Sequence, residues 1–137
     1  MSAKFYLKIF CFLFSIKFAF AEVVNLNNQQ ILELSNKNIP IIDIRRSSEW
    51  EQTGVVPGSV LLTFFDKNGK YNFKDWYTRL SLKIDARKPI ILICRTGRRT
   101  RIIAEMMDKT FDFKIYNAKN GIASWIQAKL PIIKPKY

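Results

Sequence analysis

Apolar and polar residues alternate along the chain in blocks that predict strands and helices in turn. Two stretches, residues 39–44 and 89–93, are almost continuously apolar, as expected of strands covered on both faces of a parallel sheet. Residues 59–63 form a third apolar stretch after a Pro-Gly turn, and residues 113–116 form a fourth. We predict that all four segments are β-strands.

Between these stretches, apolar residues recur every three or four positions, which is the spacing of one face of an α-helix. The strongest example is residues 100–107, where adjacent apolar pairs stand four residues apart. The other predicted helices are residues 31–34, capped by Asn27 or Asn28; residues 47–51, with a serine cap and Gly54 at the end; residues 73–82; and residues 121–130. This alternation predicts a single α/β domain, a doubly wound parallel sheet with helices on both faces.

The first 21 residues have the organisation of a secretory signal peptide. Two lysines precede the apolar run of residues 9–16, and Ala-Phe-Ala at 19–21 has the small-x-small pattern of a signal-peptidase site. The run is shorter than the about 20 apolar residues that a membrane-spanning helix needs, and retention as an anchor is the alternative. We therefore expect residues 1–21 to be a signal peptide, residues 22–137 to be the domain, and the protein to be periplasmic or otherwise exported.

The charge balance and the absence of one residue type exclude several classes of catalytic and metal site. Lysine and arginine outnumber acidic residues by 23 to 11, and the chain contains no histidine. Histidine-activated nucleophiles, an imidazole base and ordinary histidine metal sites are thereby excluded, so we expect no metal and no cofactor. Loss of residues 1–21 would remove three lysines and Cys11, leaving 20 basic residues against 11 acidic ones and a single cysteine, Cys94. Exported proteins usually pair their cysteines, so a lone thiol indicates reactivity.

Cys94 opens the candidate site, the sequence C-R-T-G-R-R at residues 94–99, between a predicted strand and a predicted helix. In open α/β sheets such junctions lie at the carboxyl ends of the strands, where ligands bind. The amino end of a helix and nearby guanidinium groups stabilise a thiolate, which is the reactive form of cysteine. A buried structural cysteine with apolar neighbours is the alternative interpretation. It is weaker, because four arginines lie between positions 95 and 101.

Several separated segments together resemble the single-domain rhodaneses, which are thiosulfate-type sulfurtransferases. They are D-I-R at 43–45, E-W at 49–50, G-V-V-P-G-S at 54–59, the C-x-x-G-x-R loop at 94–99, N-G-I-A-S-W at 120–125 and L-P-I at 130–132. Two positions depart from the family pattern. Val55 stands where many relatives have a histidine, and Asn120 replaces the first glycine of the closing pair.

The resemblance implies that Cys94 attacks a sulfane sulfur, expels sulfite from a donor such as thiosulfate, and holds a persulfide that a thiophilic acceptor removes. It implies that the donor is bound by the following residues of the loop, Arg95, Thr96, Gly97, Arg98 and Arg99. Their guanidinium and backbone N–H groups would bind the anionic donor and stabilise the anionic leaving group. Asp43 and Arg45 are interpreted as an ion pair that supports the loop.

We expect a monomer whose partners are a small anionic sulfur donor and a thiophilic acceptor, without nucleic acid. Membrane contact is expected only through an uncleaved signal or weak surface attraction. Three other functions remain as alternatives. A phosphatase or arsenate reductase on this fold needs C-x5-R, whereas Arg99 is the fifth residue after Cys94 and Thr100 the sixth. A non-catalytic rhodanese-like module could bind an anionic surface, and a thiol oxidoreductase would need a thiol from a partner.

Overall fold

The computed structural model describes residues 23–137, so the predicted signal peptide lies outside the described residues. The strands are β1 (Val24–Leu26), β2 (Ile41–Asp43), β3 (Val60–Leu61), β4 (Ile90–Ile93) and β5 (Ile115–Ala118). The helices are α1 (Asn28–Asn36), α2 (Ser47–Thr53), α3 (Phe73–Ser81), α4 (Arg98–Asp108) and α5 (Gly121–Gln127). The strands form one sheet of order β1-β5-β4-β2-β3, in which every neighbouring pair is parallel.

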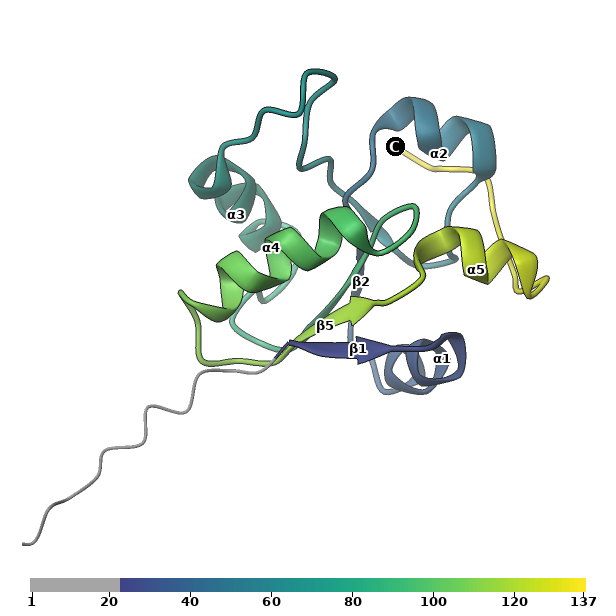
Figure 1. Ribbon diagram of the computed structural model, residues 1–137, viewed down its shortest axis with the longest axis horizontal. Coiled ribbons are helices and arrows are strands. Elements are labelled where there is room, and N and C mark those ends of the chain that lie inside the picture. Colours follow the sequence, from purple (N-terminus) through teal and green to yellow (C-terminus); the bar gives the residue numbers. More distant parts are fainter. Residues whose placement is uncertain (1–22) are drawn as a thin grey trace, which may run out of the picture.

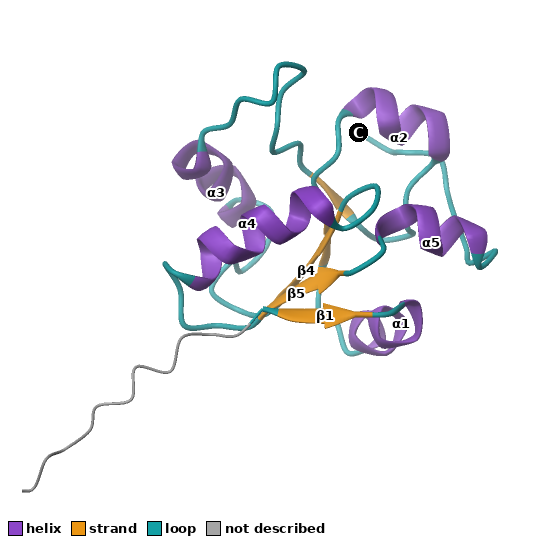
Figure 2. Cartoon of the chain, in the orientation of Figure 1, coloured by secondary structure: helices purple, strands orange, loops and turns teal. Residues whose placement is uncertain are grey.

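Helices cover both faces of this sheet (Figures 1 and 2). On one face, Trp76 of α3 and Met107 of α4 belong to a buried cluster that also holds Ile90 and Leu92 of β4. The buried cluster on the other face joins Ile91 and Ile93 of the same strand to α1 and α5. The continuous apolar run of β4 thus serves two cores, and the predicted doubly wound α/β domain is confirmed. Within residues 23–137, no helix has both the length and the apolarity to cross a membrane.

Several local predictions differ from the structure, among them the end of α5, which is Gln127 rather than residue 130. The strand β1 was not predicted, because it has only three residues and a polar centre, Asn25. The predicted serine cap of α2 is wrong: Arg46 is the N-cap residue, and its backbone N–H donates to the Glu49 carboxylate at 3.1 Å. The last strand, β5, begins two residues later than the predicted segment, residues 113–116.

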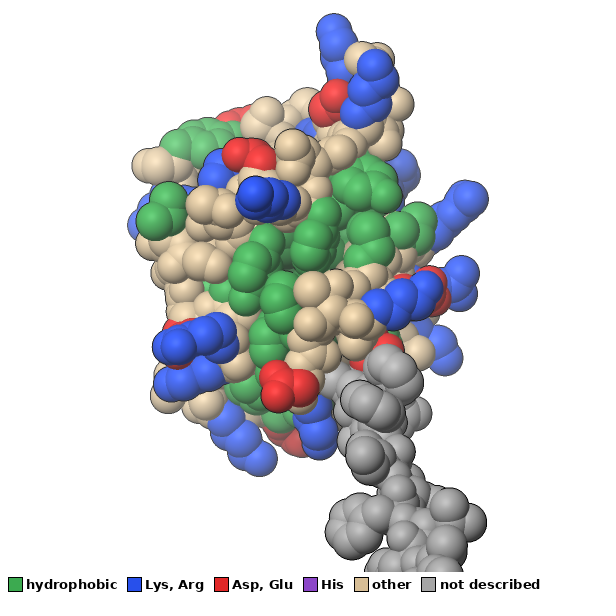
Figure 3. All heavy atoms as spheres, turned by 90° about the vertical axis from the view of Figure 1, so that its left-hand side faces the viewer, with side chains coloured by type: hydrophobic (Ala, Val, Ile, Leu, Met, Phe, Trp, Pro, Cys, Tyr) green, Lys and Arg blue, Asp and Glu red, His purple; other side chains and the backbone are tan. Residues whose placement is uncertain are grey.

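The displacement of β5 has a packing cause. Phe113 stacks on Phe111, with ring centroids 5.0 Å apart, and Phe111 stacks on Tyr77 of α3 at 4.6 Å. These half-buried rings therefore belong to the connection beside α3 and α4 rather than to the sheet. Figure 3 shows the apolar side chains gathered on this side of the molecule, with lysines and arginines around them.

A buried ion pair lies at the carboxyl end of β2. Asp43 and Arg45 are 0% and 1% exposed, and the Arg45 Nη2 donates to Asp43 Oδ2 at 2.8 Å. Arg45 also donates to the Thr53 hydroxyl at 2.8 Å and to the Gly54 carbonyl at 3.0 Å. The guanidinium therefore attaches the end of α2 to the end of β2. A buried charge needs such partners, because its desolvation is costly when it is left unpaired.

We predict that Arg45→Met lowers the free energy of unfolding by about 3–5 kcal/mol, because it leaves the Asp43 carboxylate buried without its partner. Urea denaturation of both proteins measures the difference. The control is Arg79→Met, which breaks the exposed Asp75–Arg79 pair of α3, a 3.1 Å contact, and should cost less than about 1 kcal/mol. Equal losses in the two variants would contradict the structural role assigned to the buried pair.

Candidate active site

Cys94 directly follows β4 and lies on the floor of the loop formed by residues 94–97. Its side chain is buried, at 1% exposure, and the Gly97 backbone N–H donates to its Sγ at 3.1 Å. The Thr100 hydroxyl, on the first turn of α4, lies 3.4 Å from the same sulfur. The Gly97 N–H is therefore a hydrogen-bond donor to the sulfur, and the Thr100 hydroxyl lies where it can either donate to the sulfur or accept from the thiol.

The loop packs backbone to backbone against the turn between β5 and α5. The Ile122 N–H donates to the Cys94 carbonyl at 2.9 Å, and Gly97 has a φ of +88°. A Cβ atom on Gly97 would collide with the Lys119 carbonyl oxygen, and one on Gly121 with the Arg95 carbonyl oxygen. These two glycines are therefore required by both conformation and space.

The neighbouring departure from the family pattern has a simple explanation. Asn120 has a φ of −109°, which any residue adopts, so glycine is not needed there. The other departure, Val55, is buried and forms an antiparallel β-bridge with Ile133. Neither residue contacts the sulfur through a described hydrogen bond.

Replacement of Gly97 by alanine should be far more harmful than the same change at Gly58. Gly58 also has a positive φ, +78°, but nothing lies within 4 Å of the added Cβ, so Gly58→Ala should cost only the backbone strain of about 1–2 kcal/mol. Gly97→Ala adds a backbone collision, and we expect at least twice that loss of stability together with altered thiol reactivity. Chemical denaturation and thiol alkylation measure the two effects. Matching results at both positions would argue against the close packing of the loop.

Arg99 is held by a bidentate ion pair with Glu49 of α2. The Arg99 Nη1 and Nη2 donate to the two carboxylate oxygens at 2.9 and 2.6 Å. Burial raises the pKa of Glu49, but the hydrogen bonds from Arg99 and from the Arg46 N–H outweigh it and lower the pKa from 4.5 to about 2. The hydrogen bond to Glu49 likewise raises the pKa of Arg99. Arg99 was predicted to bind substrate, but in the structure Glu49 occupies the two parallel donors of its guanidinium.

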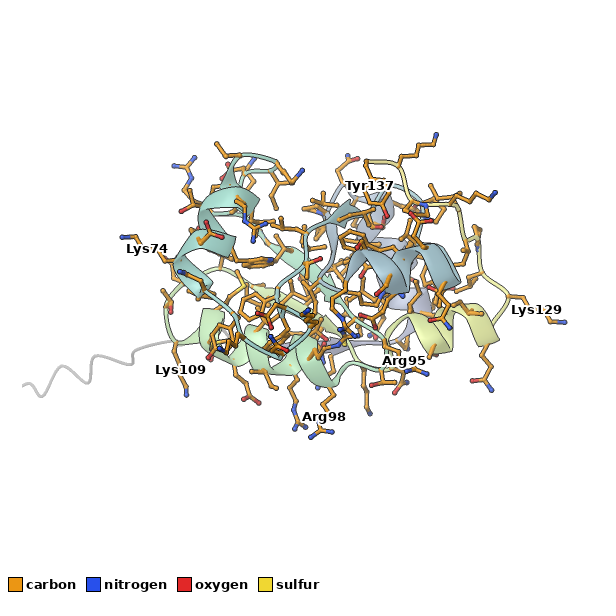
Figure 4. The ribbon with its side chains drawn as sticks, turned by 90° about the horizontal axis from the view of Figure 1, so that it is seen from above. Lys74, Arg95, Arg98, Lys109, Lys129 and Tyr137 are labelled. Carbon is orange, nitrogen blue, oxygen red and sulfur yellow. The ribbon has the colours of Figure 1, made fainter. Side chains whose placement is uncertain are left out.

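Arg95 and Arg98 have a different environment. Both side chains are exposed, and within residues 23–137 neither has a carboxylate at ion-pair distance. Figure 4 shows Arg98 extending outward from the start of α4, whereas Arg95 lies toward α5. Their donors are therefore available to a ligand, in contrast to those of Arg99.

Glu49 has a lowered pKa in the folded protein, so it contributes stability above about pH 4.5, and this contribution is lost as the pH falls towards 2. We predict that Glu49→Gln lowers the free energy of unfolding at neutral pH by about 1–2 kcal/mol. The wild type should also lose more stability than this variant between pH 4.5 and 2, as measured by denaturation at several pH values. Glu105→Gln, in the exposed pair with Arg101 at 3.8 Å, is the control and should change stability little. A pH dependence identical in wild type and Glu49→Gln would contradict the assignment.

Two cavities flank the start of α4. The first, about 350 Å³, is lined by Arg46, Phe65, Asp66, Lys67, Gly69, Arg99 and Ile102. The second, about 330 Å³, is lined by Asn25, Thr96, Gly97, Arg98, Arg101, Asn117, Lys119 and Asn120. The second cavity contains three basic side chains and no carboxylate, so its walls favour an anion. It also contains three of the predicted substrate-binding residues, Thr96, Gly97 and Arg98.

Two buried polar residues that contact the site, Thr100 and Asn117, were not predicted from the sequence. The Thr100 hydroxyl lies 2.6 Å from Asn117 Oδ1, and Asn117 is 2% exposed at the end of β5. An amide inside an otherwise apolar strand was the available signal, but the sequence does not say which group it contacts. Asp43 and Arg45 reach the loop indirectly, because they hold α2, which carries Glu49. Within the described part of the chain, no group of three or more cysteine, aspartate or glutamate side chains could bind a metal.

The sheet topology and the cysteine loop define a class of α/β domains with a buried cysteine at the carboxyl end of a central strand. The model of the rhodanese-like domain matches residues 27–128, and the chain belongs to this family. A Drosophila melanogaster relative, "Rhodanese domain-containing protein CG4456", is 32% identical over 77 residues, which cover 52% of this chain and 68% of the relative.

Solved structures share the fold at lower identity. Rv0390 from M. tuberculosis has a TM-score of 0.70 at 21% identity and covers 84% of this chain and 100% of its own. The polysulfide-sulfur transferase homodimer from Wolinella succinogenes has a TM-score of 0.62 at 21% identity, covering 84% and 81%. RPA3614 from Rhodopseudomonas palustris, described as a possible tyrosine phosphatase, has a TM-score of 0.56 at 20% identity, covering 81% and 85%. At these identities the likeness concerns the fold alone.

Proposed function

We propose that the protein is a sulfurtransferase in which Cys94 carries a sulfane sulfur from thiosulfate or a similar donor to a thiophilic acceptor. The observation that carries this proposal is the position of the Cys94 sulfur, on the floor of a cationic loop with the Gly97 N–H 3.1 Å away. The thiolate attacks the outer sulfur of thiosulfate, the S–S bond of the donor breaks, and sulfite leaves with the electron pair. An acceptor thiolate then attacks the outer persulfide sulfur and regenerates the Cys94 thiolate.

The basic residues have separate roles in this reaction. Arg95 and Arg98, whose side chains are exposed, bind the anionic donor and stabilise the departing sulfite. The Gly97 N–H stabilises the thiolate and the persulfide alike, and Thr96 contributes to the wall of the second cavity. Arg99, paired with Glu49, supplies positive charge near the sulfur from a fixed position.

The alternatives fit these residues less well. A phosphatase would need an arginine that is free to bind the oxyanion, six residues after the cysteine. Here Thr100 occupies that position, and Arg99, one residue earlier, is held by Glu49. A non-catalytic module would need only the basic surface and gives no reason for a thiol on the floor of the loop. We also propose that the protein is exported, which the signal-like residues 1–21 support, and that it is a monomer.

Brief incubation with thiosulfate should add the mass of one sulfur atom to the wild-type protein but not to Cys94→Ser, as measured by intact-protein mass spectrometry. Cys11 is present in both proteins, so the comparison assigns the added sulfur to Cys94. Cyanide should reverse the gain and release thiocyanate, because it accepts the outer persulfide sulfur. The absence of a gain with both thiosulfate and polysulfide, despite a titratable thiol, would refute the proposal. Salt-sensitive liposome association that persists in Cys94→Ser would then favour the binding-module alternative.

A further inference from the structure

The Thr100 hydroxyl is shared among more acceptors than it can serve. Its single proton has three neighbours: Asn117 Oδ1 at 2.6 Å, the Gly97 carbonyl at 3.2 Å and Cys94 Sγ at 3.4 Å. All of these groups are buried. The shortest distance places the proton between Thr100 and Asn117. A lone pair of the Thr100 oxygen therefore faces the sulfur, and in this arrangement the S–H of a neutral thiol donates to Thr100.

The hydrogen bonds continue from Asn117 to the surface. The Asn117 Nδ2 donates to Asn25 Oδ1 at 2.9 Å, and the two asparagines are directly opposite each other in the parallel strands β1 and β5. Asn25 is exposed and lines the second cavity. One chain of donors and acceptors thus joins the Cys94 sulfur, through Thr100 and Asn117, to an exposed side chain.

Ionisation of Cys94 requires the hydrogen bonds between Cys94, Thr100, Asn117 and Asn25 to run in the opposite direction. A thiolate only accepts hydrogen bonds, so the Thr100 hydroxyl can bond to it only by turning its proton toward the sulfur, which leaves the Thr100 oxygen facing Asn117 Oδ1 at 2.6 Å. Two acceptors at that distance repel each other. A half-turn of the Asn117 amide removes the conflict, because Nδ2 then donates to Thr100 and Oδ1 accepts from Asn25. The Asn25 amide has to turn as well, and its exposure makes that turn easy.

We propose that Asn117 and Asn25 are positioning residues that set the direction of the Thr100 hydroxyl and thereby the balance between thiol and thiolate at Cys94. Each amide carries both a donor and an acceptor, so the chain satisfies all its members in either direction. This inference deepens the proposed function, on which its importance for sulfur transfer rests, because the thiolate is the attacking form. A titration of the thiol needs no sulfur donor, so its failure is distinct from a failure to form the persulfide.

Charged groups around the site also influence the ionisation of Cys94, and a test must separate their Coulombic effect from that of the hydrogen-bond chain. They are Arg95, Arg98 and Arg99 of the loop and of α4, Asp43 and Arg45 after β2, Glu49 on α2, Arg101 on α4 and Lys119 after β5. Coulombic effects of exposed charges weaken with salt. A hydrogen-bond direction between buried groups does not depend on ionic strength in this way.

The decisive variant is Asn25→Asp. A carboxylate at this position only accepts, so it holds the Asn117 Nδ2 outward and the Thr100 hydroxyl turned away from the sulfur. The control is Asn120→Asp. It adds the same charge to the wall of the same cavity, but Asn120 does not belong to the hydrogen-bond chain from Cys94 to Asn25. The ultraviolet absorbance of the thiolate is followed against pH for each protein. Subtraction of the titration of its Cys94→Ser counterpart removes the contribution of Cys11.

We expect Asn25→Asp to move the thiolate transition to higher pH and to reduce the thiolate fraction below the midpoint about fivefold, the effect of one hydrogen bond of about 1 kcal/mol. This reduction should persist in high salt, whereas Asn120→Asp should give a smaller effect that salt removes. In an Asn117→Leu protein, which interrupts the chain, Asn25→Asp should behave like Asn120→Asp. Equal, salt-sensitive shifts for the two aspartates would overturn the proposal, as would an undiminished Asn25→Asp shift in the Asn117→Leu protein.

Discussion

The close backbone packing between the cysteine loop and the turn after β5 is the constraint on which the site depends. Each segment places a glycine against a carbonyl oxygen of the other, Gly97 against Lys119 and Gly121 against Arg95. The Cys94 carbonyl is also bonded to the Ile122 N–H. Because both sides lack a side chain at the point of contact, neither segment can change without moving the other. The position of the sulfur is therefore determined jointly by β4 and β5, which are neighbours in the sheet.

The arginines around the site divide into two groups with different physical uses. Arg45 and Arg99 are committed to Asp43 and Glu49, so they supply fixed charge and hold α2 against the rest of the domain. Arg95 and Arg98 retain their donors. A fixed charge needs no reorganisation when a negative charge develops nearby, whereas an exposed guanidinium can follow a ligand that arrives and leaves. A reaction in two steps, with an anion departing in the first, benefits from both.

Much of the fold was predictable because local patterns report burial. The continuous apolar run of β4 indicated a strand covered on both faces, and the paired apolar residues at 100–107 indicated the helix α4 that follows the loop. The partners of the polar residues were not predictable. Glu49 and Arg99 are 50 residues apart in the chain, and they meet only because β2 and β4 are adjacent in the sheet. The same holds for Asn117, whose polar side chain in a strand gives no information about its neighbours until the strand order is known.

The end of the chain is tied to α2 as well. Ile133 pairs with Val55 just after the helix, and the Tyr137 hydroxyl donates to the Glu51 carboxylate at 2.6 Å. The helix that presents Glu49 to Arg99 is thus held from two directions, by the buried Arg45 and by the carboxy-terminal tail, which runs beside α2 (Figure 1). Its position does not depend on the few residues of the helix alone.

The strand order places the first strand beside the last, with Asn25 and Asn117 separated by 92 residues. Contacts over such separations are costly in chain entropy and slow to form. Refolding or synthesis can therefore assemble β4 and its loop before β1 is in place. On the proposed hydrogen-bond chain, the ionisation of Cys94 would then differ between a domain with β1 docked and one without it. The ionisation of Cys94 would therefore indicate whether β1 has paired with β5 at the amino-terminal edge of the sheet.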